Sequence, residues 1–268
     1  MAVDHSFMIR KIQSKTKIFV AYCAYTNMPF VECDDETGND RIYIFESEAL
    51  LQEFAKKYAE QKIAIKGVEV KNKSFLRFYS SLFAVGINEL VFQNEQQTLA
   101  FELEKLVRRP DLSALKPEQR PVVNESLQLT GLYFMQEASR PVPPEEKEGL
   151  EDLQEELTAN MLKGTYILAY QMQDGAETLE EKIRDHKYTV LVIKDNDGNT
   201  YPPALTDPFE LEKFSKGKKF TALRVPFAGL TKFLIKDAKG FMLNPAGFHI
   251  LMPRELLDAL PQQFQEEE

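Results

Sequence analysis

Residues 35–54, DETGNDRIYIFESEALLQEF, return in altered form as residues 195–214, DNDGNTYPPALTDPFELEKF. Five residues recur at the constant spacing of 160 that separates Gly38 from Gly198. They are Asp35, Gly38, Asn39, Leu51 and Phe54, which return as Asp195, Gly198, Asn199, Leu211 and Phe214. Similarity at a fixed spacing indicates one structural unit used twice. We therefore expect the chain of 268 residues to contain two similar units.

Within each copy, predicted strands alternate with predicted helices. The repeated stretch itself predicts a turn at its glycine and then a strand, followed by a helix that Ser47 caps in the first copy and Asp207 in the second. Further along, we expect a helix at 227–238, a pair of strands within 240–252 and, closing the first copy, a helix at 95–108. The predicted fold class is α/β (α+β), with a mixed sheet and flanking helices in each unit.

The expected boundaries follow from composition. The first unit is predicted to cover residues 1–109, in a diverged form, and the second to cover 144–268. Residues 110–143 contain several prolines and are typical of a linker. Within them, LQLTGLYFM at 127–135 alternates enough to predict a strand that pairs with the edge of one copy.

Charge and hydropathy exclude several classes of protein. The net charge is −9, from 42 acidic and 33 basic residues, which argues against a general nucleic-acid binder and is compatible with a basic partner. The N-terminal residues lack the apolar core of a secretory signal. The most apolar stretch, 75–92, is interrupted by Arg77, Asn88 and Glu89, so no membrane span is predicted. We expect a cytoplasmic protein.

Several features together resemble the SseB-type domain, a family named for enhanced serine sensitivity. They are the opening strand pair, the short strand leading into ALTDPFELEKF, the strand that ends in RVPF, and GFMLNPAG. The second copy, at about 144–260, carries the resemblance best, whereas the first, at about 10–109, lacks the proline after Asn88. The resemblance implies a mixed α/β sheet in a soluble bacterial protein, and it implies no established reaction or catalytic residue set.

Catalytic and metal-binding motifs are missing from the sequence. It contains no GxSxG, HExxH, P-loop or GxGxxG. None of the histidines, His5, His186 and His249, lies three or four residues from a second ligand, so we expect no metal and no cofactor. Counting outward from an Asn27-Met28 turn places Cys23 and Cys33 nearly opposite each other. Two interpretations stand for these cysteines: a redox-sensitive pair, or two small buried residues.

The remaining candidate is a surface of the second copy. Asp207, Arg224, Asn244 and Pro245 lie at the ends of predicted strands, where α/β sheets place their ligands. Arg224 is able to hold a carboxylate or phosphate with two hydrogen bonds, although pairing with Asp207 would give it a purely structural role. Ser47 and Gly67 occupy the matching places in the first copy, so such a site would exist once per chain.

Two functional hypotheses follow. In the first, the protein is a non-enzymatic interaction or regulatory module that presents loops or a sheet edge to a protein partner. In the second, the second unit binds or senses a small anionic metabolite, for example an amino acid, near Arg224. An enzyme ranks third, because no nucleophile or general base can be identified.

Overall fold

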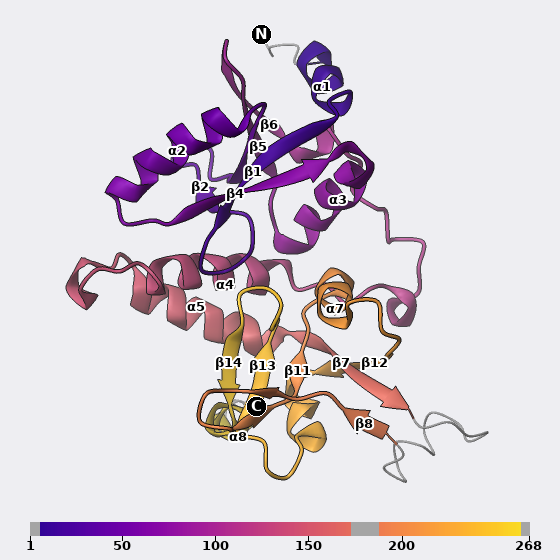
Figure 1. The fold of residues 1–268 in the computed structure, drawn as a ribbon. Coiled ribbons are helices and arrows are strands. Elements are labelled where there is room, and N and C mark those ends of the chain that lie inside the picture. The colour runs from indigo at the N-terminus through magenta and orange to yellow at the C-terminus, as the bar shows by residue number, and fades with distance from the viewer. Residues whose placement is uncertain (1–5, 173–187, 264–268) are drawn as a thin grey trace. The chain divides into compact units, whose positions relative to one another are not determined.

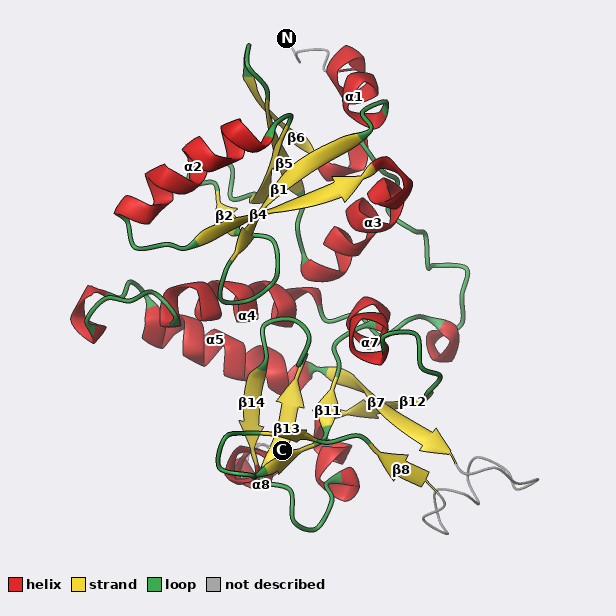
Figure 2. Cartoon of the chain, viewed as in Figure 1, coloured by secondary structure: helices red, strands yellow, loops and turns green. Residues whose placement is uncertain are grey.

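The structure, a computed structural model, describes residues 6–172 and 188–263. The chain forms two compact units. The first contains residues 1–120 and 128–157, and the second contains residues 121–127 and 158–268. Two helices, α4 (Glu125–Ala138) and α5 (Leu150–Lys163), therefore contribute residues to both units. The predicted α/β fold is confirmed (Figure 1; Figure 2).

The first unit is built around one mixed sheet. Its strands are β1 (Lys17–Cys23), β2 (Val31–Cys33), β3 (Asp40–Phe45), β4 (Ile65–Lys71), β5 (Glu89–Gln93) and β6 (Thr98–Glu102). Its helices, besides parts of α4 and α5, are α1 (Ser6–Gln13), α2 (Glu48–Glu60) and α3 (Phe75–Val85), with 3-10 turns η1 (Asn72–Ser74), η2 (Leu103–Lys105), η3 (Pro117–Gln119) and η4 (Pro144–Glu146). The strand order is β4-β1-β3-β5-β6, and β2 pairs with β3. Among these strands of the described residues, β3 and β5 run parallel and the other pairs are antiparallel.

The second unit contains shorter strands. They are β7 (Thr165–Met172), β8 (Tyr188–Val190), β9 (Ile193–Lys194), β10 (Thr200–Tyr201), β11 (Pro203–Ala204), β12 (Thr221–Pro226), β13 (Gly240–Leu243) and β14 (Ile250–Pro253). Its helices, besides parts of α4 and α5, are α7 (Pro208–Ser215) and α8 (Arg254–Gln263), with the 3-10 helix η5 (Phe227–Phe233). The sheets have the orders β12-β7-β8, β11-β13-β14 and β10-β9.

The two units pair their strands in the same succession. A bridge between Ile167 and Leu205 connects β7 to the end of β11, as the pairing of Phe19 with Phe45 connects β1 to β3. The order β4-β1-β3-β5-β6 in the first unit thus corresponds to β12-β7-β11-β13-β14 in the second. In both units the parallel pair is the third of the four neighbouring pairs, β3 with β5 and β11 with β13.

The repeated stretch has the predicted local structure in both units. Gly38 and Gly198 have φ values of +67° and +83°, which glycine adopts without steric cost. Ser47 caps α2 by accepting a hydrogen bond from the backbone N–H of Leu50, and Asp207 caps α7. From α2, Leu51 points into the core of the first unit with Phe30, Phe45 and Tyr58. The predicted strand pair within 240–252 is confirmed as β13 and β14.

Residues 127–135 form part of helix α4 rather than the predicted strand. The structure buries the consecutive residues 127 and 128 and again 130–132, a pattern that a strand, with its alternating faces, does not produce. A short apolar run fits the periodicity of a helix as well as that of a strand. Residues 125–126 and 136–138, which extend the helix to 14 residues, fall within the predicted linker.

Two other predicted helices are wrong in part. Residues 95–108 contain β6 and η2, because the side-chain oxygen of Asn94 accepts the backbone N–H groups of Gln96 and Gln97, both at 2.9 Å, and turns the chain back along β5. The helix predicted at 227–238 is the shorter 3-10 helix η5. Its glycine, Gly229, weakens a longer α-helix.

Candidate functional site

Two of the predicted site residues meet at the carboxyl ends of the parallel strands β11 and β13. The amide of Asn244 accepts the backbone N–H of Thr206 at 3.0 Å and donates to the Thr206 hydroxyl at 2.8 Å. That hydroxyl donates in turn to Asp207 at 2.8 Å. All three residues are fully buried. Asp207 and Asn244 therefore tie two strand ends together from inside the unit.

The other two predicted residues lie apart from this buried contact. Arg224 is exposed on the edge strand β12, opposite Ile167 of β7. Pro245 is half-buried in the turn that follows Asn244. Strand register also corrects the predicted match between the copies. Phe19 and Ile167 occupy the same place in the two units, and they lie opposite Glu69 and Arg224 respectively. Glu69, not Gly67, thus holds the place of Arg224 in the first unit.

The buried end of the second unit is unfavourable for an anion. The Asp207 carboxylate accepts the backbone N–H groups of Phe209 at 2.7 Å and Glu210 at 3.1 Å in addition to the Thr206 hydroxyl. Burial nevertheless raises the pKa of Asp207, an effect that these hydrogen bonds only reduce. An anionic ligand placed there would lie beside a carboxyl group. The N–H and O–H groups around it already donate their hydrogen bonds to Asp207.

Glu210, which the sequence did not single out, is the most unusual residue of this region. It is 1% exposed, and its Oε1 pairs with Lys213, while Oε2 has no hydrogen-bond partner. A Cβ built on Gly247 would lie 2.9 Å from Oε2, so the carboxylate packs directly against this glycine and would have to shift if a side chain were added. Burial raises the pKa of Glu210, with Lys213 opposing and Asp207 adding to the rise. In the sequence, its burial is indicated by the repeat, which aligns Glu210 with Leu50.

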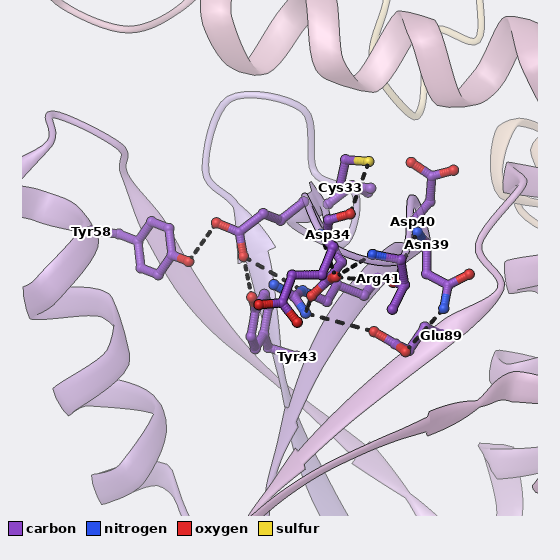
Figure 3. A network of polar contacts seen from close by, with 12 residues as sticks. Cys33, Asp34, Asn39, Asp40, Arg41, Tyr43, Tyr58 and Glu89 are labelled. Carbon is purple, nitrogen blue, oxygen red and sulfur yellow. Dashed lines mark hydrogen bonds and ion pairs between the residues drawn. The ribbon is translucent and has the colours of Figure 1, made fainter.

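A different polar network surrounds Arg41 of β3 in the first unit (Figure 3). Its guanidinium pairs with Asp34, lies 3.7 Å from Oε1 of Glu89 and 3.8 Å from Oε2 of Glu32. Tyr43 also donates a hydrogen bond to Glu32. The Arg41 network, as we call it, consists of Glu32, Asp34, Asn39, Asp40, Arg41, Tyr43, Tyr58 and Glu89.

Residues from other elements fix the geometry of the Arg41 network. Tyr58 reaches from α2 to donate to Oε1 of Glu32 at 2.8 Å, as Figure 3 shows. Tyr133 of α4 donates to Asp40 at 2.7 Å, and Asn39 donates to Oε2 of Glu89 at 3.2 Å. Glu89 is 8% exposed, and its Oε1 has an ion-pair contact with Arg41 but no hydrogen bond. One buried carboxylate oxygen of the network thus keeps acceptor capacity.

Burial and hydrogen bonding shift the pKa values of several groups in and around the Arg41 network. Burial raises the pKa of Tyr43 to about 12 and also raises the pKa values of Tyr58 and Tyr133, so these hydroxyls stay protonated. Hydrogen bonds from Thr37 hold the pKa of Asp34 below its ordinary value. The network therefore presents carboxylates beside protonated phenols and the guanidinium of Arg41.

The two cysteines are not opposite each other. Cys23 is buried, and its backbone N–H bonds to Met28, whereas Cys33 is exposed and pairs with Asp40 of β3. The hairpin register is set by the bridge between Tyr22 and Pro29, not by the assumed Asn27-Met28 turn. Partial desolvation, followed by the nearby Asp40, Asp35 and Asp34, raises the pKa of Cys33, which makes its thiolate scarce.

The second unit contains a cavity away from the four predicted residues. Its volume is about 340 Å³, and it is lined by Val123, Asn124, Glu125, Ser126, Leu127, Asn160, Lys163 and Gly164. The side chain of Asn124 anchors this wall by donating to the backbone oxygens of Thr165 at 2.8 Å and Thr206 at 2.6 Å. Lys163 and Glu125 bring opposite charges to the cavity.

Among the described residues, no three His, Cys, Asp or Glu side chains are grouped so as to hold a metal ion. His5 and His186 lie outside the described residues, and His249 is exposed, with a φ of +43°, in the turn before β14 rather than in a strand. Within the same residues, no helix combines the length and apolar character needed to cross a membrane.

Comparisons with known proteins leave the family open. No family model matches the chain, and no curated protein matches it. Among solved structures, the chain matches Tic22 from Plasmodium falciparum at 12% identity, over 97% of this chain and 98% of that chain, with a TM-score of 0.20. A score that low supports no conclusion about fold or function. The resemblance to the SseB-type domain stays a prediction from the sequence.

Proposed function

We propose that this protein is a non-enzymatic interaction module whose β2–β3 hairpin binds a basic segment of a partner protein. The Arg41 network carries the proposal, because it sets three carboxylates, those of Glu32, Asp34 and Glu89, around the guanidinium of Arg41. Asp40, which accepts a hydrogen bond from Tyr133, adds a fourth carboxylate to the network. The turn of the same hairpin adds Asp35 and Glu36, both exposed. On the resemblance to the SseB-type family, we place this interaction in the cytoplasm of a bacterium.

Pre-organisation supports a binding role for the hairpin. Asp34 accepts hydrogen bonds from the backbone N–H groups of Glu36 at 3.0 Å and Thr37 at 2.8 Å, so the turn is already ordered. Tyr58 and Tyr133 hold two of the carboxylates from neighbouring helices. A surface fixed in advance loses less conformational entropy on binding than a flexible one does. Complementary charge then raises the association rate and selects a basic partner.

The test compares two double variants of equal charge. Asp35→Asn with Glu36→Gln removes the exposed acids of the turn, and Glu53→Gln with Glu60→Gln removes two exposed acids of α2. The probe is a fluorescent oligo-arginine peptide, titrated at low and at physiological ionic strength. We expect the turn variant to bind about fivefold more weakly and the α2 variant to match the unaltered protein. Equal losses in both variants would mean attraction by net charge alone and would overturn the proposal.

Small-molecule binding by the second unit is a second candidate, and the cavity beside Lys163 is the observation that favours it. We propose that an anionic metabolite, for example an amino acid, would bind there rather than beside Asp207. A thermal-shift screen against amino acids and organic acids tests this candidate with Lys163→Ala and Arg224→Ala. A ligand-induced shift lost only in the Lys163 variant supports the cavity, and one lost only in the Arg224 variant supports the surface predicted from sequence.

A further inference from the structure

The strand β4 forms one border of the sheet in the first unit. It pairs with β1 along its whole length, from Ile65 opposite Cys23 to Lys71 opposite Lys17. Figure 1 shows β4 at the outside of this sheet, with α2 and α3 to its two sides. The other long side of β4 faces no strand among the described residues.

Hydrogen bonding beyond the two ends of β4 shows which backbone groups face outward. Ala24 donates to the backbone oxygen of Ala64 at 2.9 Å, and Asn72 donates to that of Thr16 at 2.8 Å. In an antiparallel pair, hydrogen-bonded and non-bonded residues alternate. The even-numbered residues of β4 therefore bond to β1. The backbone N–H and C=O groups of Ile65, Gly67, Glu69 and Lys71 point away from the sheet.

The corresponding edge of the second unit offers fewer donors. Phe227 donates to the backbone oxygen of Gly164, so the alternation places the groups of Ala222, Arg224 and Pro226 on the outer side of β12. Pro226 has no N–H, and proline is one of the residues that protect sheet edges. The edge of β4 contains no proline. Of these two corresponding edges, β4 is therefore the more complete template for an added strand.

The side chains around the β4 edge are mainly basic, although the chain as a whole carries a net charge of −9. Lys71 and Lys73 are exposed, and Lys66 is half-exposed. The one acid of the strand, Glu69, pairs with Lys17 at 2.6 Å. These lysines repel the same edge of a second copy, and they attract a strand that carries carboxylates.

An apolar contact lies just past the end of β4 in the chain. Leu76, in the first turn of α3, is 72% exposed, although α3 packs other apolar residues into the core. On the opposite face, Gly67 lets α2 approach closely, because a Cβ there would lie 3.0 Å from the side chain of Leu51. The edge is thus bordered by a tightly packed helix on one face and has an exposed leucine beyond its end.

We propose that the outer edge of β4 accepts an extended acidic segment of a partner protein as an additional strand. Backbone hydrogen bonds to Ile65, Gly67, Glu69 and Lys71 supply the affinity, and the lysines select the charge. This surface is separate from the β2–β3 hairpin and opposite to it in charge, so the inference goes beyond the proposed function. With both surfaces, the first unit would contact two segments of opposite charge.

The test uses a fluorescent peptide as long as β4, made of alternating valine and glutamate. Glu69→Pro removes one outward N–H at an edge position that tolerates proline, and Glu69→Thr is the matched control that removes only the charge. We expect the proline variant to bind the peptide about tenfold more weakly and the threonine variant to bind at least as well as the unaltered protein. Equal binding by the two variants would overturn the proposal.

A second measurement needs no variant and decides the question if Glu69→Pro fails to fold. The same peptide, N-methylated at every second residue on the bonding side, keeps its charge but cannot donate backbone hydrogen bonds. The proposal requires that the methylated peptide bind at least about tenfold more weakly, and equal binding would overturn it. Titration of the oligo-arginine peptide against Glu69→Pro separates the two hypotheses, because loss of β-strand addition leaves binding at the hairpin unchanged.

Discussion

Helices α2 and α7 occupy the same place in the two units, and one inward-facing position differs in chemistry between them. Both follow a polar cap, Ser47 or Asp207. Three residues after the cap, the first unit has a half-buried leucine, Leu50, and the second has Glu210, which is 1% exposed. The repeated pattern of a cap and an apolar stripe is therefore enough to form the helix. The third position after the cap can therefore hold either leucine or glutamate.

The change at that position alters the demands on its surroundings. Leu50 packs against the aromatic cluster of the first unit, which includes Phe30, Phe54 and Tyr58. Glu210 pairs with the cation of Lys213, and its carboxylate packs against Gly247. Because one of its oxygens still has no hydrogen bond, the second unit carries a desolvation cost at this position, which Leu50 does not carry in the first.

The largest difference between the units is expected at the repeated leucines. Leu51 is 3% exposed in the core of the first unit, whereas Leu211 is half-buried in the second. We predict that Leu51→Ala lowers the free energy of unfolding of the first unit by about 3 kcal/mol, and that Leu211→Ala costs the second about 1 kcal/mol. Urea denaturation measures both. Leu51→Met, which conserves volume, is the control, and equal losses at the two leucines would contradict the comparison.

The helix caps should differ in the opposite direction. Asp207 accepts two backbone N–H groups and the Thr206 hydroxyl, whereas Ser47 accepts one N–H at 3.4 Å. We predict a loss of about 2 kcal/mol for Asp207→Ala and about 0.5 kcal/mol for Ser47→Ala, measured by thermal unfolding. Asp207→Asn keeps the capping oxygen, so it should cost less than the alanine variant. A larger loss at Ser47 than at Asp207 would refute this ranking.

The sequence predicted the parts of the fold that depend on local chemistry. The positive φ of Gly198, the caps Ser47 and Asp207 and the strand pair β13–β14 follow from residues close together in the chain. Helix α4 was missed, because a short apolar run fits both periods until its polar extension is counted. Local secondary structure can thus be predicted from sequence where a turn or a helix cap determines it.

The candidate sites were less accessible from sequence. The Arg41 network joins Asp34 to Glu89 across 55 positions of sequence and depends on which strands are neighbours. The sequence showed its acidic run, ECDDE at 32–36, but not the arginine that orders it. Glu210 appeared as an ordinary helical glutamate, because burial is a tertiary property. Only its alignment with Leu50 indicated that this side of the helix faces the interior.

The third predicted effect is a gain in stability. Burial raises the pKa of Glu210 above its ordinary value of about 4.3, so the folded second unit holds this proton more tightly than the unfolded chain does. The stabilisation is complete below the ordinary pKa and is lost as the pH rises through the folded-state value. Glu210→Leu, which copies Leu50, should therefore raise the free energy of unfolding at pH 7 by about 1 kcal/mol.

The same variant should flatten the pH dependence of the second unit. In the unaltered protein we expect stability to fall as the pH rises above the ordinary glutamate pKa of about 4.3, with Asp207 contributing in the same direction because burial raises its pKa too. Glu210→Leu should remove the contribution of Glu210 to that fall, and Glu210→Gln, which keeps the shape, should do the same. Denaturation of the three proteins across this range measures the effect. If all three lose stability equally, Glu210 is ionised at little cost, and its burial does not distinguish the second unit from the first.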